Sequence, residues 1–231
     1  MIPKTLFEDL LRPGDLVFDV GAHAGVRTAQ FLACGARVVA VDPLPDAADW
    51  LRRVYGGHSR VAVVEAAVGP REGAATLRIG SADTTVSTCE PWFIEATSRT
   101  KRFGEAMAWE DTAQVRMTTI GALAKEHGEP WFVKLDIEGF EPQALLGCPA
   151  APPLVSFEFT PEMEGHAKKC VDLLLALDGE YRFGWSYGES LALSADLGWV
   201  GAAQILEMLG KIGGATVFGD VYAARPQALA R

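Results

Sequence analysis

LVFDVGAHAGVRT, residues 16–28, is the stretch that decides the fold of this chain. It opens with an apolar run of strand length, residues 16–20, that carries a single acid, Asp19. A turn of small residues containing Gly21 and Gly25 follows, and the next residues have the spacing of an amphipathic helix. A buried strand, a glycine turn and a helix in this order predict one unit of an α/β fold.

The turn also has the features of a ligand-binding loop. Its glycines allow a ligand to approach the backbone closely, and the helix that starts near Gly25 offers free N–H groups. The spacing G-x-x-x-G differs from the G-x-G-x-x-G that binds a dinucleotide pyrophosphate. Asp19, just before the turn, would repel a pyrophosphate and attract an ammonium group. The loop therefore favours S-adenosylmethionine, whose tail carries an ammonium, over NAD.

Two further strand-like segments end in candidate cofactor contacts. Residues 37–42 form an apolar run that ends in Asp42, about 20 residues past the loop, where the acid of a βαβ unit accepts ribose hydroxyls. The alternative is that Asp42 only caps a turn before Pro43. Residues 61–69 predict a third buried strand that ends in small residues. An adenine ring could lie against this end, or the small residues could only pack under a helix.

Composition and charge narrow the class of protein. The 231 residues are 49% hydrophobic and 22% charged, as in soluble globular proteins, and we expect one domain over residues 1–231. No apolar run has the length of a membrane span and the N-terminus lacks signal-peptide features, so we expect a cytoplasmic protein without a membrane partner. A net charge of -9 disfavours nucleic acid as a partner.

Cysteine and histidine spacing predicts no metal centre. The four cysteines show no C-x-x-C pair, and the four histidines lack metal-ligand spacing. One histidine, His23, lies in the ligand loop, where a structural or ligand-stacking role is favoured over acid–base catalysis.

Alternating strands and helices predict a mostly parallel sheet covered by helices on both faces. Further strands are predicted over residues 75–79, 115–119, 131–137, 153–159, 181–187 and 215–223. Helices are predicted over residues 5–11, 26–34, 46–55, 120–127, 163–177 and 200–211. Residues 80–113 are predicted to be irregular and, being too long for a plain connection, to form a substrate lid or insert. The tail, residues 226–231, is predicted to be loose.

The segment WFVKLDIEGFE, residues 131–141, carries most of the candidate chemistry. On a strand, alternate residues share a face, so Lys134, Asp136 and Glu138 should point together. Charges inside a central strand are costly unless they are paired or functional. We expect Asp136 and Glu138 to bind a cationic methyl donor and to orient or deprotonate an acceptor. The alternative is an internal ion pair between Lys134 and Asp136.

Acids follow or end several predicted parallel strands. Because ligands gather beyond the carboxyl ends of such strands, these acids predict a site at one edge of the sheet. The five acids are Asp19, Asp42, Glu65, Asp136 and Glu158.

Six segments together resemble the FkbM-type family of S-adenosylmethionine-dependent methyltransferases. They are VFDVGAHAGVRT, VVAVDP, VVEAAVG, MTTIGAL, VKLDIEGFE and PLVSFEF, in order from about residue 15 to residue 160. The most specific is the K-x-D-x-E-G-x-E pattern that begins at Lys134. The resemblance implies a Rossmann-like class I methyltransferase fold, with a seven-stranded sheet whose last strand is antiparallel. It also implies transfer to an oxygen acceptor, often a hydroxyl of a sugar, polyketide or other natural product.

The resemblance also implies a cofactor site. It places Asp19, Gly21 and Gly25 at the methionine end of S-adenosylmethionine, Asp42 at the ribose, and Glu65, Ala66 and Ala67 near the adenine. We expect the site to be completed by Ala22, His23, Pro43 and Asp136. Two residues depart from the family pattern: His23 stands where asparagine is common, and Glu65 where a neutral amide is usual.

The remaining candidates are the catalytic residues and the residues that contact the acceptor. Asp136 is the expected base or positioning group, with Glu138 in support and Glu158 as the second candidate base. The acceptor, a small molecule or carbohydrate, is expected to contact Thr84, Ser87, Trp92, Trp185 and Tyr187. Alternatively, the aromatic residues of segment 80–113 pack among themselves as a small satellite core.

Three other functions remain open from the residues. The carboxylates of Asp136, Glu138 and Glu141 could serve a metal-dependent hydrolase, although carboxylate spacing alone is a weak signal. A nucleotide-dependent oxidoreductase shares the fold class but would prefer a G-x-G-x-x-G loop. A module that binds the cofactor without catalysis is the third.

Overall fold

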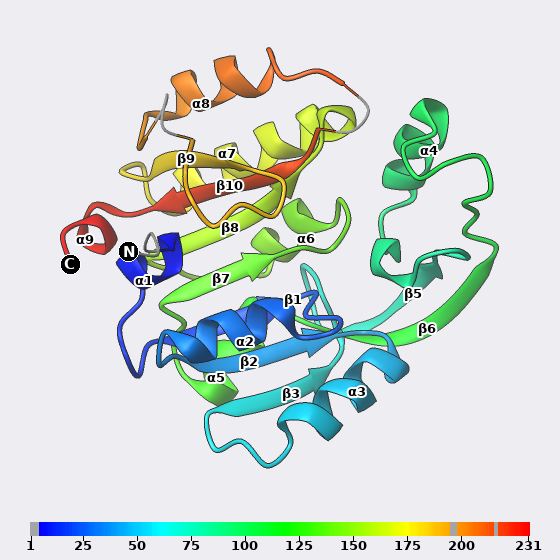
Figure 1. Cartoon of the computed structure of the whole chain (residues 1–231), viewed down its shortest axis with the longest axis horizontal. Helices are drawn as coiled ribbons and strands as arrows, with labels where there is room; N and C mark the ends of the chain where they lie inside the picture. Colours follow the sequence, from blue (N-terminus) through cyan, green and yellow to red (C-terminus); the bar gives the residue numbers. More distant parts are fainter. Residues whose placement is uncertain (1–4, 195–197, 215–216) are drawn as a thin grey trace.

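A twisted sheet forms the centre of the molecule (Figure 1). The computed structural model describes residues 5–194, 198–214 and 217–231. Within them the sheet has seven strands in the order β3-β2-β1-β7-β8-β10-β9, and β10 runs antiparallel to both its neighbours. The predicted seven-stranded, mostly parallel fold with an antiparallel last strand is therefore confirmed. The strands are β1 (Leu16–Val20), β2 (Arg37–Asp42), β3 (Val61–Glu65), β7 (Phe132–Leu135), β8 (Leu154–Phe159), β9 (Arg182–Tyr187) and β10 (Gly219–Ala224).

Helices cover both faces of the sheet because the strands are apolar on both sides. Val17 and Phe18 show the alternation: Val17 packs against α1 and α2, and Phe18 lies in the core cluster shared with α5 to α8. The helices on the first face are α1 (Leu6–Leu10), α2 (Val26–Ala33), α3 (Pro45–Tyr55) and α9 (Pro226–Leu229). Those on the second face are α5 (Ile120–His127), α6 (Glu141–Leu146), α7 (Glu164–Leu177) and α8 (Ala202–Leu209).

A second, smaller sheet lies beside the carboxyl ends of the central strands (Figure 1). Its strand order among the described residues is β4-β6-β5. The predicted third strand over residues 61–69 is therefore wrong at its end, because the chain leaves the main sheet after Glu65 and enters the smaller one. The elements of this part are β4 (Ala67–Val68), β5 (Gly73–Ile79), a 3₁₀ turn η1 (Thr84–Val86), α4 (Pro91–Thr100) and β6 (Asp111–Thr118).

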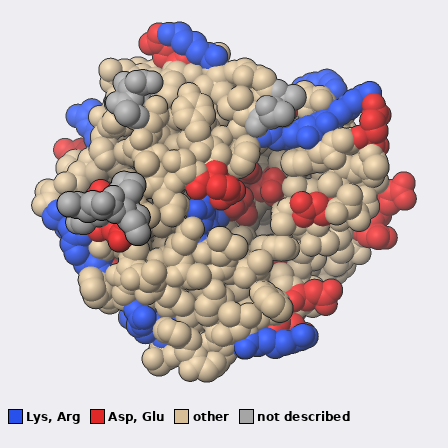
Figure 2. Space-filling view, in the orientation of Figure 1, with Lys and Arg blue, Asp and Glu red and all other residues tan. Residues whose placement is uncertain are grey.

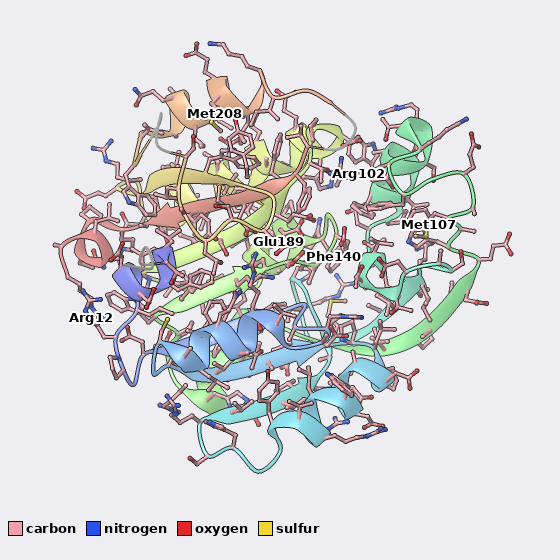
Figure 3. All side chains as sticks on the ribbon, in the orientation of Figure 1. Arg12, Arg102, Met107, Phe140, Glu189 and Met208 are labelled. Atoms are coloured by element: carbon pink, nitrogen blue, oxygen red, sulfur yellow. The ribbon has the colours of Figure 1, made fainter. Side chains whose placement is uncertain are left out.

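The expectation that residues 80–113 are irregular is wrong, because they contain α4 and the start of β6. Pro91 begins α4, where its missing N–H costs nothing. Phe93 is buried and packs with Phe103 and Trp109, so the alternative of a satellite aromatic core is confirmed. Arg102 (Figure 3) joins this part to the segments that follow β8 and precede β10: its guanidinium contacts Glu162 at 3.1 Å and donates to the Val217 carbonyl.

Three other sequence expectations need correction. The tail is not loose, because residues 226–229 form α9 and Arg231 pairs with Asp15 at 2.7 Å while covering the Trp131 ring. The strand predicted over residues 131–137 ends at Leu135, so Asp136 and Glu138 lie in a loop. The strand predicted over residues 215–223 begins at Gly219, and residues 215–216 lie outside the described residues. No helix of the described part is both long and apolar enough to cross a membrane.

Candidate active site

Two adjoining cavities open at the carboxyl ends of the central strands, where ligands of such sheets bind. We call them the inner cavity and the acidic cavity. The inner cavity is bordered by Asp42, Ala66, Ala67, Thr84 and Phe140, among others. The acidic cavity is bordered by Arg27, Lys134, Glu138, Glu158 and Glu189, among others. Gly21, His23, Thr85 and Asp136 border both.

The glycine turn is shaped by the protein's own packing. Gly21 and Gly25 both have φ near +80°, in the left-handed region that favours glycine. A Cβ on Gly21 would collide with the carbonyl oxygen of Asp136, and one on Gly25 would come within 2.7 Å of the Tyr55 ring. A ligand was expected to approach these two glycines closely. In the structure, neighbouring segments of the chain make that close approach. The turn brings His23 to the wall shared by the two cavities.

Asp42 is oriented by two backbone hydrogen bonds. The His23 N–H donates to Oδ2 and the Leu44 N–H donates to Oδ1, both at 2.9 Å. Burial raises the pKa of Asp42, and these hydrogen bonds act against that rise. The alternative that Asp42 caps a turn is therefore confirmed, because Asp42 accepts the hydrogen bond from the Leu44 N–H. Each carboxylate oxygen still has a lone pair for another donor, so Asp42 is also suited to bind a diol at the inner cavity.

Asp19 lies beneath the turn and is fully buried. The Thr28 hydroxyl donates to its Oδ2 at 2.6 Å, and Oδ1 has no hydrogen-bond partner among the described residues. Burial raises the pKa of Asp19, against the lowering effect of the Lys134 ammonium. Asp19 is not among the described residues that border either cavity, so it supports the turn from below.

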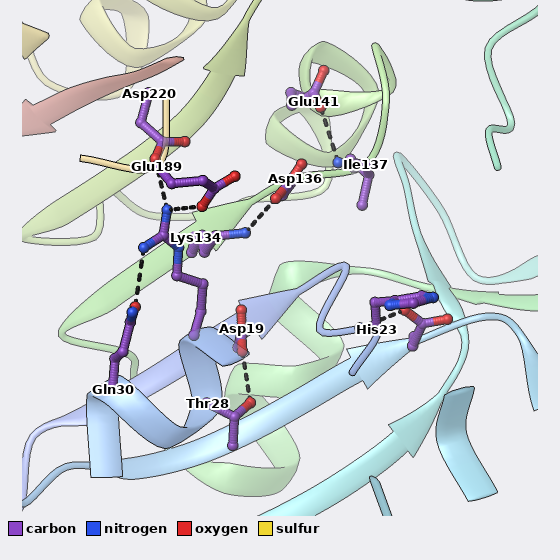
Figure 4. A network of polar contacts seen from close by, with 12 residues as sticks. Asp19, His23, Thr28, Gln30, Lys134, Asp136, Ile137, Glu141, Glu189 and Asp220 are labelled. Carbon is purple, nitrogen blue, oxygen red and sulfur yellow. Dashed lines mark hydrogen bonds and ion pairs between the residues drawn. The ribbon is translucent and has the colours of Figure 1, made fainter. Parts of the chain in front are cut away.

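Lys134 forms the ion pair considered above, with its Nζ 2.7 Å from Asp136 Oδ2 (Figure 4). Burial alone would lower the pKa of Lys134, but the surrounding carboxylates, above all Asp136, outweigh it and raise the pKa. The buried ammonium therefore keeps its charge and holds the carboxylate of Asp136 in place. Because Asp136 borders both cavities, the ion pair and a functional role are compatible.

A carboxylate cluster borders the acidic cavity, and Figure 2 shows acidic side chains in the hollow at the centre of that face. Asp136, Glu138 and Glu158 offer oxygens that all lie within 4.8 Å of one another. Burial raises the pKa of Glu138 and Glu158 well above the usual range, and the neighbouring carboxylates add to this rise. Glu138 has φ +56°, and its carbonyl accepts a hydrogen bond from the Thr88 hydroxyl, which fixes the turn.

Glu141, the third acid of the hydrolase alternative, lies elsewhere. Its Oε1 accepts hydrogen bonds from the Ile137 and Gly139 N–H groups, at 3.0 and 3.3 Å (Figure 4). It is buried, and burial raises its pKa to about 7. Glu141 therefore shapes the loop after β7, and among the described residues Glu158 of β8 completes the cluster instead.

A second group of charges lies at and beside the acidic cavity, and sequence reasoning missed Arg27 and Asp220 in it. Arg27 donates to Glu189 Oε2 at 2.6 Å and to Gln30, and lies 3.9 Å from Asp220 (Figure 4). Burial raises the pKa of Asp220 to about 6, although Lys134 opposes the rise. A lone acid in the apolar strand of β10 is the signal that could have identified Asp220.

The residues expected to bind an acceptor divide into two groups. Thr84 and Ser87 border the inner cavity, and the Thr84 hydroxyl lies 3.4 Å from His23 Nε2. Three aromatic residues, Trp92, Trp185 and Tyr187, are not among the described residues that border either cavity, and the expectation for them needs correction.

The reason differs for each aromatic residue. Trp185 is fully buried against Phe159 because it belongs to the core. Tyr187 is exposed beside it, and Trp92 stacks on His166 at the outer surface.

Three expected cofactor residues also lie away from the inner cavity. Glu65 pairs with Arg52 at 2.9 Å, which turns its carboxylate to the surface. Ala22 borders the acidic cavity, and Gly25 acts as the residue before α2. The inner cavity does include the expected Pro43, Ala66 and Ala67.

The model of the methyltransferase FkbM domain matches residues 19–183. The chain belongs to this family. The members of this family are methyltransferases that use S-adenosylmethionine. The hydrolase and oxidoreductase alternatives are set aside on this ground. No curated protein matches the chain.

One solved structure of an FkbM methyltransferase shares the fold of this chain. The FkbM methyltransferase of Methylobacillus flagellatus KT matches with a TM-score of 0.56 and 14% identity, over 92% of this chain and 44% of that one. The chain thus spans less than half the length of that relative. The precorrin-6Y C5,15-methyltransferase of Geobacter metallireducens GS-15 matches with a TM-score of 0.45 and 10% identity, over 95% of this chain and 86% of that one.

Proposed function

We propose that the chain transfers the methyl group of S-adenosylmethionine to a hydroxyl oxygen of a small-molecule or carbohydrate acceptor. One observation carries the proposal: the carboxylates of Asp136, Glu138 and Glu158 lie within 4.8 Å of one another in the cavity beside the inner cavity. A hydroxyl acceptor must lose a proton during methyl transfer, and such a cluster supplies bases for it.

The inner cavity has the features that the adenosine part of the cofactor requires. Asp42 presents two oriented oxygens for the ribose diol. Ala66, Ala67 and Phe140 give a small and apolar wall against which an adenine can lie. Asp136 lies where the inner cavity meets the acidic cavity, and its carboxylate attracts a positively charged group of a ligand there. These residues fit S-adenosylmethionine.

When bound, the cofactor supplies a methyl group on a sulfonium, and the chain's residues do the rest. Lys134 holds Asp136, which orients the acceptor hydroxyl at the junction of the cavities. Positioning of this kind accounts for roughly 7–11 kcal/mol of a barrier. Glu138 and Glu158, whose pKa values are raised, hold a proton more tightly than ordinary carboxylates do, and a base adds about 10²- to 10⁴-fold in rate.

The test starts with binding and ends with the product. Calorimetry measures the affinity of the cofactor site for S-adenosylhomocysteine. NAD, which the site is not expected to bind, is the negative control. Methyl-labelled S-adenosylmethionine is then offered with panels of sugars, hydroxylated natural products and amines. A labelled methyl ether supports the proposal. Methylation of amines alone, with no transfer to any hydroxyl, would overturn oxygen transfer while leaving the family membership intact.

A further inference from the structure

Three cavities lie in series between the proposed acceptor site and the molecular surface. Next to the acidic cavity is a small chamber, and next to the chamber is a surface hollow. Glu158 borders both the acidic cavity and the chamber. His166 borders both the chamber and the surface hollow. Two titratable residues therefore stand at the two walls of the chamber.

Thr160 gives the chamber an unusual polar atom. Its side chain is buried, borders the chamber, and has a hydroxyl with no hydrogen-bond partner among the described residues. Buried hydroxyls in proteins are almost always hydrogen-bonded to protein or to ordered water. The chamber has room for about one water molecule and is bordered by several polar groups, which meets the requirements of a buried water site.

His166 is placed to connect this chamber with solvent. It lies on α7, with its Nε2 3.8 Å from Glu90 Oε2 and its ring stacked on Trp92. Burial lowers the pKa of His166, against the raising effect of Glu90. A neutral imidazole has one nitrogen that donates and one that accepts, so it can take up a proton on one side and release one on the other.

We propose that Glu158, the Thr160 hydroxyl, one chamber water and His166 form the route by which the acceptor's proton leaves the acidic cavity. The inference rests on the proposed transfer to a hydroxyl. In that reaction a C–O bond forms, the methyl C–S bond breaks, and the hydroxyl proton passes to Glu158. The same proton then crosses the chamber to His166 and reaches solvent, which returns Glu158 to its starting state.

The surroundings explain why such a route is useful. Glu158 is faced by the acids Asp136, Glu138, Glu141 and Asp220 and by the cation Arg102. A proton left on Glu158 would prevent it from acting as a base in the next turnover. His166 is faced by Glu90 and Lys169. Its titration therefore reports on both the chamber and these surface charges.

The experiment measures the pKa of His166 by NMR on protein with labelled histidine rings, saturated with S-adenosylhomocysteine. The signal is assigned by its loss in His166→Gln. Glu158→Gln is expected to shift the pKa of His166 by about 0.5 unit, because the carboxyl that it replaces no longer exchanges a proton with the Thr160 hydroxyl and the chamber water. In the Thr160→Val background this effect should fall by more than half, and in the matched Thr160→Ser background it should persist.

An equal effect of Glu158→Gln in all three backgrounds would mean a direct through-space electrostatic effect and would overturn the route. No effect in any background would overturn it as well. The measurement needs no acceptor, so its outcome is independent of the methyl-transfer assay. If hydroxyl methylation is found and the coupling is absent, only the route fails. If the coupling is present and no hydroxyl is methylated, only the proposed reaction fails.

Discussion

Asp220 of β10 lies directly opposite Glu158 of β8 in the antiparallel register, so two acids are cross-strand neighbours beside the acidic cavity. Like charges in this relationship destabilise one another. Burial raises the pKa of Asp220 to about 6, and burial together with nearby carboxylates raises the pKa of Glu158 further from its usual range. The pairing makes Glu158 a stronger proton acceptor than an isolated glutamate.

Glu158→Gln should therefore lower methyl transfer by about 10²- to 10⁴-fold, because the amide cannot accept the proton. The affinity for S-adenosylhomocysteine should stay within about tenfold, since Glu158 does not border the inner cavity. Rates with labelled cofactor and calorimetry measure the two quantities. Glu105→Gln, a change in an exposed acid, is the matched control. Full activity of Glu158→Gln would assign the base to another carboxylate.

Asp42→Asn should weaken binding of S-adenosylhomocysteine by roughly ten- to a hundredfold. The amide keeps one oxygen, and its NH₂ group must face a backbone N–H that now donates to the carboxylate, which costs about 1–3 kcal/mol. Calorimetry measures the change. Asp46→Asn, an exposed substitution in the first turn of α3, should bind normally. Equal affinity of the two variants would place the ribose elsewhere.

Glu141 should make the stability of the protein depend on pH. Its pKa is about 7 in the folded chain, against 4.5 ordinarily, so the folded state holds the proton more tightly than the unfolded state. Stability is then lost as pH rises through this window, by up to about 3 kcal/mol. The free energy of unfolding of Glu141→Gln relative to wild type should therefore increase between about pH 5 and pH 8.

Chemical denaturation at the two pH values measures this difference. Glu105→Gln again provides the control, because its exposed carboxylate should show no such trend relative to wild type. A constant difference between Glu141→Gln and wild type across the window would show that Glu141 is ionised normally in the folded protein.

Gly21→Ala should destabilise the chain more than Gly14→Ala does. Both glycines have positive φ, of 82° and 91°, so both substitutions carry a backbone penalty of about 1 kcal/mol. Only Gly21 adds a collision, because its Cβ would meet the carbonyl oxygen of Asp136, while the space around Gly14 is open. Denaturation midpoints of the two variants isolate the collision. Equal midpoints would mean that the loop after β7 yields without cost.

Local patterns were sufficient where an element is apolar and bounded by clear turns. The strands over residues 16–20 and 37–42 and the helix over residues 120–127 were predicted with their observed bounds. In contrast, α4 escaped prediction because its stability comes from distant partners. Phe93 packs on Met163, and Arg102 reaches Glu162. A window of neighbouring residues contains none of these contacts.

The site was predictable to a similar extent. Acids at the ends of parallel strands do meet, because strand ends share one edge of the sheet. The strand periodicity applied to Glu138 failed, because the chain turns left-handed there after β7 has ended. Trp185 was expected to contact the acceptor but lies in the core. Residue type alone does not tell which side of a strand faces the interior. Arg27 and Asp220 meet only through the fold.

Asp136, Gly21 and His23 border both cavities. Binding of a ligand in one cavity must therefore change the free energy of binding in the other. Whatever factor the cofactor imposes on acceptor affinity, the acceptor must impose on the cofactor in return. In the proposed mode of binding, the demethylated product would keep most of the cofactor's contacts and would lack the positive sulfur beside Asp136. On that proposal, one carboxylate would distinguish the charged donor from its spent form and would link product release to the departure of the methylated acceptor.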